Sequence, residues 1–162
     1  MTKKEIRDIL WGIGCNSWNR YETFLTIASK LEKENYWYGL RIAYEGSDNL
    51  YIQKKNVYRA FSKNEPCKNA LMSKEERKYL KSLPDQITIF RGMTELELKS
   101  KNFGVSWTLK KEVAQFFSET YQRNYSTKHL PKTIHSIDIE KSKVVAFFNK
   151  IKEFEIIYLH SK

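Results

Sequence analysis

Three groups of polar residues in the second half of the chain have the types and the order that suit chemistry at a ribose. Arg91 follows the apolar run "ITIF", Ser106 and Thr108 lie in "GVSWT", and Glu153 and Glu155 lie in "EFEII". An arginine offers a planar fork of donors to phosphate, and hydroxyl groups can bind a sugar hydroxyl or orient a carboxylate. A glutamate beside a departing glycosidic group can stabilise a ribosyl cation. Together the groups suit cleavage of a bond between ribose and a good leaving group.

Each group alone has a simpler structural explanation. An arginine at a strand end is usually solvated or ion-paired, and Thr108 suits a helix N-cap because "LKKEVAQFF" follows it. Trp107 should point opposite to its neighbours, into packing. Side chains two apart in an extended chain share one face, so Glu153 and Glu155 would stand side by side, as on an ordinary polar strand edge. The three groups in this order favour the catalytic interpretation.

The order and the local sequence resemble the mono-ADP-ribosyltransferases of the arginine–serine–glutamate class. Their pattern is Arg-Gly at the end of the first core strand, then Ser-x-Thr running into a helix with an apolar face. Near the end, Glu-x-Glu or Gln-x-Glu enters a hydrophobic strand. Here these are Arg91-Gly92, "SWTLKKEVAQFF" from Ser106, and "EFEII" from Glu153. The similar region spans roughly residues 86–159, just under half of the chain.

The resemblance implies an α+β fold, with two small, roughly perpendicular sheets forming a split β-sandwich around an NAD cleft. Arg91 would then bind the NAD phosphates and the nicotinamide ribose, and the Gly92 backbone would meet the nicotinamide amide. Ser106 would bind the ribose or hold the catalytic glutamate, and Thr108 would support the strand end.

The resemblance also gives the two glutamates different roles. Glu155 would be the catalytic glutamate, bound to the ribose 2′-hydroxyl as nicotinamide leaves. Glu153 would orient the acceptor, and a glutamate at that position goes with arginine acceptors in this family.

Aromatic residues near these motifs have two interpretations. Phe116, Phe117 or Tyr121 could stack on nicotinamide, but we favour helix core for Phe116 and Phe117. Phe117 is also included in the cofactor-binding set. Phe147 and Phe148 precede the glutamates, where the family's acceptor-recognition turn carries an aromatic residue. The run "VVAFF" also has the pattern of a buried strand, and we favour core for both.

The first half of the chain is predicted to be helical and the second half to be mainly strands. Capping boxes at Thr2/Glu5 and Ser73/Glu76 support the first and last of these helices. We expect helices at 2–11, 16–35, 36–46, 49–62, 74–83 and 109–122, and strands at 86–92, 103–107, 132–139, 143–148 and 154–159. The prediction is a single domain over residues 1–162, with a helical part at 1–83 and an NAD-binding β core at 84–162.

The chain has a net charge of +10, which favours an acidic partner such as a phosphate-bearing ligand, nucleic acid or an acidic protein. A surface rich in lysine gives the same number. No apolar run approaches the length of a membrane span, and "MTKKEIRD" lacks the apolar centre of a signal peptide. We therefore expect a cytoplasmic protein without a membrane partner. Delivery into another cell would leave no trace in this sequence.

Neither the cysteines nor the histidines suggest a metal site. Cys15 and Cys67 lack a C-x-x-C spacing, and free, mostly buried thiols are expected. His129, His135 and His160 are scattered and unlike a set of metal ligands.

The resulting expectation is an enzyme that uses NAD as a substrate, without a metal, and transfers ADP-ribose to a protein side chain, arginine being the expected acceptor. The acceptor protein is unidentified, and the positive charge favours one that is acidic or associated with nucleic acid. Three alternatives stay open. They are an NAD glycohydrolase, a transferase acting on nucleic acid, and a non-catalytic binding or inhibitor protein on the same fold.

Overall fold

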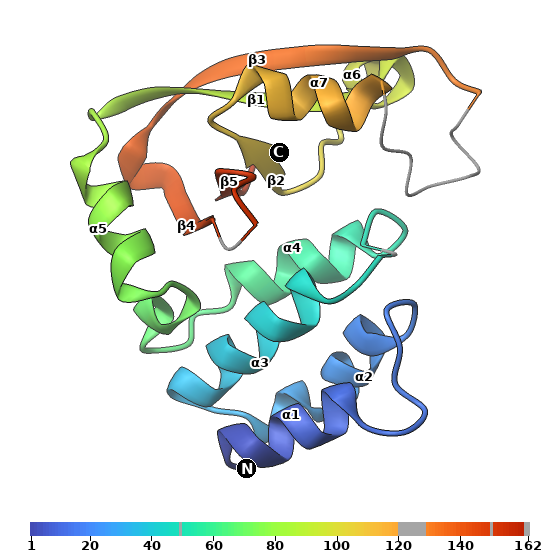
Figure 1. Cartoon of the computed structure of the whole chain (residues 1–162), viewed down its shortest axis with the longest axis vertical. Coiled ribbons are helices and arrows are strands. Elements are labelled where there is room, and N and C mark those ends of the chain that lie inside the picture. Colours follow the sequence, from blue (N-terminus) through green and yellow to red (C-terminus); the bar gives the residue numbers. More distant parts are fainter. Residues whose placement is uncertain (49, 120–128, 150, 161–162) are drawn as a thin grey trace. The chain divides into compact units, whose positions relative to one another are not determined.

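In the computed structural model, residues 1–48, 50–119, 129–149 and 151–160 are described. The chain divides into two compact units, Met1–Leu71 and Met72–Lys162. The first unit is helical and the second carries the sheet, so the predicted α+β class with a helical N-terminal half is confirmed (Figure 1). None of the described helices is long and apolar enough to cross a membrane.

The first unit consists of helices that pack around aromatic side chains. The helices are α1 (Lys3–Trp11), α2 (Arg20–Ile27), α3 (Lys33–Glu45) and α4 (Lys54–Ser62). The predicted capping box of Thr2 and Glu5 opens α1, and Gly46 ends α3. The buried core includes Ile6, Leu10, Phe24, Trp37, Leu40 and Phe61. These apolar residues recur at helical spacing, which explains why each helix buries one face.

A buried arginine ties three of these helices together. Arg20 is 5% exposed, and its Nε donates to the carbonyl oxygen of Leu10 at 2.8 Å. Its Nη1 donates to the carbonyl oxygen of Gly46, and its guanidinium lies over the Trp11 ring. The charge therefore meets carbonyls at the C-terminal ends of α1 and α3, where the helix dipoles favour a cation.

Two predicted helices of the first unit begin later than expected. The helix predicted from residue 16 begins at Arg20 because the Asn16 side chain accepts from the backbone N–H of Trp18 at 2.9 Å, which favours a turn. It also ends early, because Leu31 is extended and Lys33 has a φ of 52°. The helix predicted from residue 49 begins at Lys54.

Cys15 and Cys67 are free, but Cys67 is exposed, which corrects the expectation of mostly buried thiols.

The second unit contains a five-stranded antiparallel sheet with the strand order β3-β1-β2-β5-β4. Its elements are α5 (Lys74–Ser82), β1 (Gln86–Thr94), α6 (Glu95–Ser100), β2 (Ser106–Thr108), α7 (Lys111–Glu119), β3 (Lys132–Glu140), β4 (Val144–Phe148) and β5 (Glu155–Tyr158). The predicted capping box at Ser73 and Glu76 opens α5. Helix α6 was not predicted.

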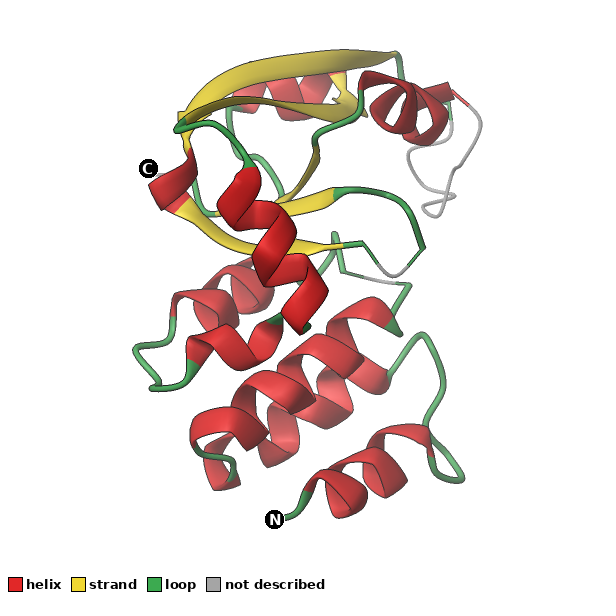
Figure 2. Ribbon diagram, turned by 60° about the vertical axis from the view of Figure 1, so that its left-hand side comes forward, coloured by secondary structure: helices red, strands yellow, loops and turns green. Residues whose placement is uncertain are grey.

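The sheet has two parts that meet at one point. Strands β1 and β3 pair along their whole length, from Gln86 opposite Glu140 to Thr94 opposite Lys132. Strands β1 and β2 share a single pair, Phe90 opposite Thr108. Figures 1 and 2 show β1 and β3 as a long paired ribbon and β2, β4 and β5 as shorter strands beside it.

The main core cluster of the second unit takes buried residues from all five strands. Its buried members are Ile87, Ile89, Met93, Trp107, Ile139, Phe147 and Ile156. Alternate residues of β1 are buried, as expected for a strand with one face against a core. Trp107 is 2% exposed, so the prediction that it points into packing is confirmed, and Phe147 and Phe148 are buried as favoured.

Helix α7 packs differently from the prediction. Its buried residues are Ala114 and Ser118, whereas Phe116 is 48% exposed, so the assignment of Phe116 to the helix core is wrong. The small residues face Gly92 of β1, where an added Cβ would lie 2.2 Å from the Ala114 carbonyl oxygen. Close contact between the helix and β1 therefore selects small side chains on both.

Candidate active site

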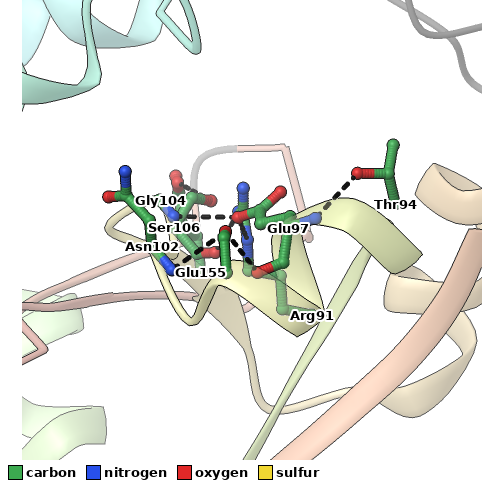
Figure 3. Close-up of polar contacts among 8 residues, drawn as sticks. Arg91, Thr94, Glu97, Asn102, Gly104, Ser106 and Glu155 are labelled. Atoms are coloured by element: carbon green, nitrogen blue, oxygen red, sulfur yellow. Dashed lines mark hydrogen bonds and ion pairs between the residues drawn. The ribbon is translucent and has the colours of Figure 1, made fainter.

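Arg91 lies near the middle of the site, on β1, with its side chain 16% exposed. Its Nε donates to Oε1 of Glu97 at 2.9 Å, and its Nη1 donates to the carbonyl oxygen of Ser106 at 2.7 Å (Figure 3). Arg91 therefore connects α6 to β2. Such a paired, hydrogen-bonded guanidinium is held in a fixed orientation.

Glu97 is a buried residue of α6 that sequence reasoning missed. It is 5% exposed, and its Oε1 accepts from the backbone N–H of Gly104 at 2.9 Å as well as from Arg91. The backbone N–H of Glu97 donates to Oγ1 of Thr94 at 3.1 Å, which caps the helix. The signal in the sequence was the Thr94-x-x-Glu97 spacing directly after the Arg91 strand.

Gly104 allows the guanidinium of Arg91 to lie against the backbone. A Cβ added at Gly104 would be 2.6 Å from Nη2 and 3.0 Å from Cζ of Arg91. A side chain at this position would therefore displace the guanidinium. Sequence reasoning missed Gly104 too, since a single glycine before a strand gives no specific signal.

Ser106 and Glu155 meet between two neighbouring strands. Strand β2 pairs with β5 so that Ser106 lies opposite Ile157 and Thr108 lies opposite Glu155. The Ser106 hydroxyl reaches diagonally and donates to Oε1 of Glu155 at 2.5 Å (Figure 3). This length is typical of a strong hydrogen bond. The structure shows Ser106 bonded to Glu155, and a contact between Ser106 and the ribose stays a prediction.

Thr108 supports the end of the strand but does not cap α7. Its Oγ1 donates to the carbonyl oxygen of Glu153 at 2.7 Å and accepts from the backbone N–H of Lys110 at 3.1 Å. Helix α7 begins at Lys111, too late for Thr108 to be its N-cap. The predicted N-cap is therefore wrong, because the hydroxyl is engaged with the segment that precedes β5.

Glu153 and Glu155 do not lie on one extended strand, as the sequence suggested. Phe154 between them has a φ of 49°, in the left-handed region, and β5 begins only at Glu155. The backbone N–H of Phe154 donates to Oδ1 of Asn149 at 3.2 Å, and its carbonyl oxygen accepts from the N–H of Leu109 at 3.1 Å. Glu153 therefore belongs to a turn and Glu155 to the sheet.

The same turn is attached to α5. The backbone N–H of Asn149 donates to Oε1 of Glu76 at 2.9 Å, while Oε2 of Glu76 accepts from the backbone N–H of Ser73 at 2.7 Å. Glu76 is 7% exposed. The sequence identified Glu76 only as part of a capping box, and its contact with the turn before Glu155 was missed.

The remaining residues predicted for the site are Gly92, Phe117 and Tyr121. Packing of α7 explains why residue 92 is glycine, and a contact between its backbone and nicotinamide stays a prediction. Phe117 is half-buried on α7, with its ring centroid 5.6 Å from that of Phe116, and its cofactor role also stays a prediction. Tyr121 lies outside the described residues.

His135 of β3 and His160, which follows β5, lie in an aromatic cluster. The ring centroid of Phe103 is 5.5 Å from that of His135 and 4.8 Å from that of His160, and Trp107 packs against both histidines. Burial, together with the charge of His135, lowers the pKa of His160.

Within residues 1–48, 50–119, 129–149 and 151–160, no three His, Cys, Asp or Glu residues gather as a metal site would need.

Searches beyond this chain give no relative from which to take a function. No protein-family model, curated protein or solved structure matches the sequence or the fold. The site itself shows an arginine, a serine and a glutamate joined in series across β1, β2 and β5. Such a series can bind an anion at one end and present an oriented carboxylate at the other.

Proposed function

We propose that the protein is an NAD-dependent mono-ADP-ribosyltransferase that transfers ADP-ribose to a protein side chain, with arginine as the acceptor. The observation that carries the proposal is the hydrogen bond from Ser106 to Glu155, together with that from Arg91 to the Ser106 carbonyl. These are the three residues of the arginine–serine–glutamate pattern, and the fold brings them together from strands far apart in the sequence.

In the proposed reaction, Glu155 stabilises the positive charge that develops on the ribose. Nicotinamide leaves with the electron pair of the C–N bond, which neutralises its ring, and the ribose becomes an oxocarbenium ion. A carboxylate held in advance by the Ser106 hydroxyl needs little rearrangement to meet this charge. Arg91 would bind the diphosphate of NAD, as the resemblance implies.

The two-part sheet supports the more specific fold that the resemblance implies. Strands β1 and β3 form one part, strands β2, β5 and β4 the other, and only Phe90 and Thr108 pair between them. This division is what a split β-sandwich around a cleft requires. We therefore propose an ADP-ribosyltransferase-like fold for the second unit.

Glu153 would act on the acceptor rather than on NAD. Its backbone carbonyl is held by Thr108, and the left-handed Phe154 separates it from β5. This difference in backbone position suits two separate roles. Glu153 would orient and deprotonate an arginine guanidinium, whose nitrogen then forms the bond to the ribose C1′ while the proton passes to the glutamate.

Incubation with labelled NAD and a cell lysate tests the proposal. Nicotinamide release and labelled protein are the expected results, and both should be lost in Glu155→Gln. Nicotinamide release without labelled protein would indicate hydrolysis, and a nuclease-sensitive product would indicate transfer to nucleic acid. If NAD is not consumed at all, the enzymatic proposal is wrong and a binding protein on this fold becomes the better explanation.

A further inference from the structure

Glu97 is a buried carboxylate to which the proposed reaction has so far given no role. Its helix, α6, and helix α5 both begin after a hydroxyl residue and carry a glutamate at the third helical position. In α5 the glutamate turns back, and Glu76 accepts from the N–H of Ser73 to complete a capping box.

Helix α6 forms only half of such a box. The Glu97 N–H donates to Thr94, but the Glu97 carboxylate accepts from Arg91 and Gly104 instead of the Thr94 N–H. A carboxylate that could cap its own helix is used to hold the arginine and the loop before β2. The Glu97 carboxylate therefore contributes to the site by holding Arg91 rather than by capping α6.

The hydrogen bonds of Arg91 use two of its three guanidinium nitrogens. Nε is taken by Glu97 and Nη1 donates to the Ser106 carbonyl. Nη2 lies against Gly104, and no acceptor for it is found among the described residues. Because a guanidinium is planar, fixing Nε and Nη1 also fixes the direction in which Nη2 presents its N–H groups.

We propose that Glu97 is a positioning residue that orients Arg91 so that its Nη2 edge meets the diphosphate of the dinucleotide. The identity of this ligand rests on the proposed function. An arginine held in advance loses less conformational freedom when the anion binds, which strengthens binding. The same bond keeps Arg91 on the Ser106 carbonyl, and so links the diphosphate end of the site to the serine that holds Glu155.

The test is the binding of ADP-ribose, which carries the diphosphate without nicotinamide, measured by calorimetry. Glu97→Met removes both acceptor oxygens, and the dissociation constant should rise about tenfold or more, the scale of one charge-assisted hydrogen bond. Glu97→Gln keeps an acceptor oxygen and should stay within about threefold of the wild-type chain. Glu95→Gln, on the exposed face of the same helix, is the matched control and should bind as the wild-type chain does.

A second measurement separates positioning from stability. The side-chain Nε–H of Arg91 gives an NMR signal that Arg91→Lys identifies by its loss. This signal should shift in Glu97→Met and be unchanged in Glu95→Gln. Where Glu97→Met does not fold, Glu97→Asp takes its place, because its shorter side chain cannot reach both Arg91 and Gly104 and should weaken ADP-ribose binding.

The outcomes distinguish this inference from the proposed reaction. A folded Glu97→Met that binds ADP-ribose like the wild-type chain would overturn the positioning role, as would a wild-type chain that does not bind ADP-ribose. Binding of ADP-ribose without cleavage of NAD would contradict only the proposed reaction. The variants would still decide the role of Glu97 in that case.

Discussion

The Ser106 hydroxyl donates to Oε1 of Glu155 at 2.5 Å, from one strand to a diagonal position on its neighbour. Both residues lie on regular strands, so the register of β2 and β5 sets their separation. Ser106 is held in turn by Arg91, through its carbonyl oxygen. The register of β2 and β5 therefore brings the Ser106 hydroxyl within reach of the Glu155 carboxylate and helps to orient it.

Replacement of this serine should slow the proposed reaction without preventing folding. Ser106→Ala leaves Glu155 without its short hydrogen bond, and we expect kcat for nicotinamide release to fall between about tenfold and a hundredfold. Because Ser106 is only half-buried, the midpoint of thermal unfolding should change little. Ser142→Ala, at an exposed serine that bonds to Glu140, is the control and should keep the wild-type rate. A wild-type rate in Ser106→Ala would show that Ser106 does not act on Glu155.

Substitution of Glu155 and of Glu153 should cause different losses of activity. Glu155→Gln keeps the size of the side chain but removes its charge, so both transfer and NAD hydrolysis should fall by at least about a hundredfold. Glu153→Gln should lose transfer to arginine while keeping part of the hydrolysis, because the proposed role of Glu153 concerns the acceptor. The measurement is nicotinamide release with and without an arginine acceptor, alongside labelled product. Equal losses of both activities in Glu153→Gln would contradict the division of roles.

Features that depend on neighbours in sequence could be predicted. The capping boxes at Thr2/Glu5 and Ser73/Glu76 located the starts of α1 and α5, because a cap is formed by residues three apart. Strands β1 and β3 were found from their β-branched residues. The order of Arg91, Ser106 and Glu155 also indicated that the three lie close together, although not how they are bonded.

Features that depend on distant contacts could not be predicted. Glu97 accepts hydrogen bonds from Arg91 and Gly104, and these two residues come within reach of it only when α6 folds back on β1. The run "EFEII" has the pattern of a continuous strand, yet Phe154 is left-handed because Asn149 and Leu109 hold its backbone from two sides. Apolar periodicity carries no information about such bonds.

The two glycines near Arg91 should respond differently to alanine. In Gly92→Ala the new methyl group meets the Ala114 carbonyl at 2.2 Å, and backbone cannot give way, so unfolding free energy should fall by about 2 kcal/mol. In Gly104→Ala the methyl group meets Nη2 of Arg91 at 2.6 Å, which a side chain can relieve by moving. This variant should keep most of its stability but bind ADP-ribose more weakly. Denaturant unfolding and calorimetry check the pair, and a reversed order would contradict the described packing.

Replacing Tyr21 with phenylalanine should make the folded chain more stable. It is 2% exposed, and its hydroxyl has no hydrogen-bond partner among the described residues. Tyr21→Phe removes this desolvated group and should stabilise the chain by about 1 kcal/mol. Burial also raises the pKa of Tyr21. Since the unfolded tyrosine ionises at about pH 10, stability should be lost as the pH rises above this value, less so in the variant. Denaturant unfolding at pH 7 and pH 10.5 gives both quantities, and a destabilised variant would indicate that the hydroxyl is bonded.

His160 should make the chain less stable in acid. Burial and the charge of His135 lower its pKa, so the unfolded histidine takes up a proton at a higher pH, about 6.5, than the folded one. Between these two values the unfolded chain binds more protons, and stability therefore falls as the pH falls through this window. His160→Phe keeps an aromatic ring beside Phe103 and should lose less stability between pH 8 and pH 5. His129→Gln, at an exposed histidine, should retain the wild-type pH dependence, as measured by denaturant unfolding. The same loss in His160→Phe as in the wild-type chain would assign the effect to another group.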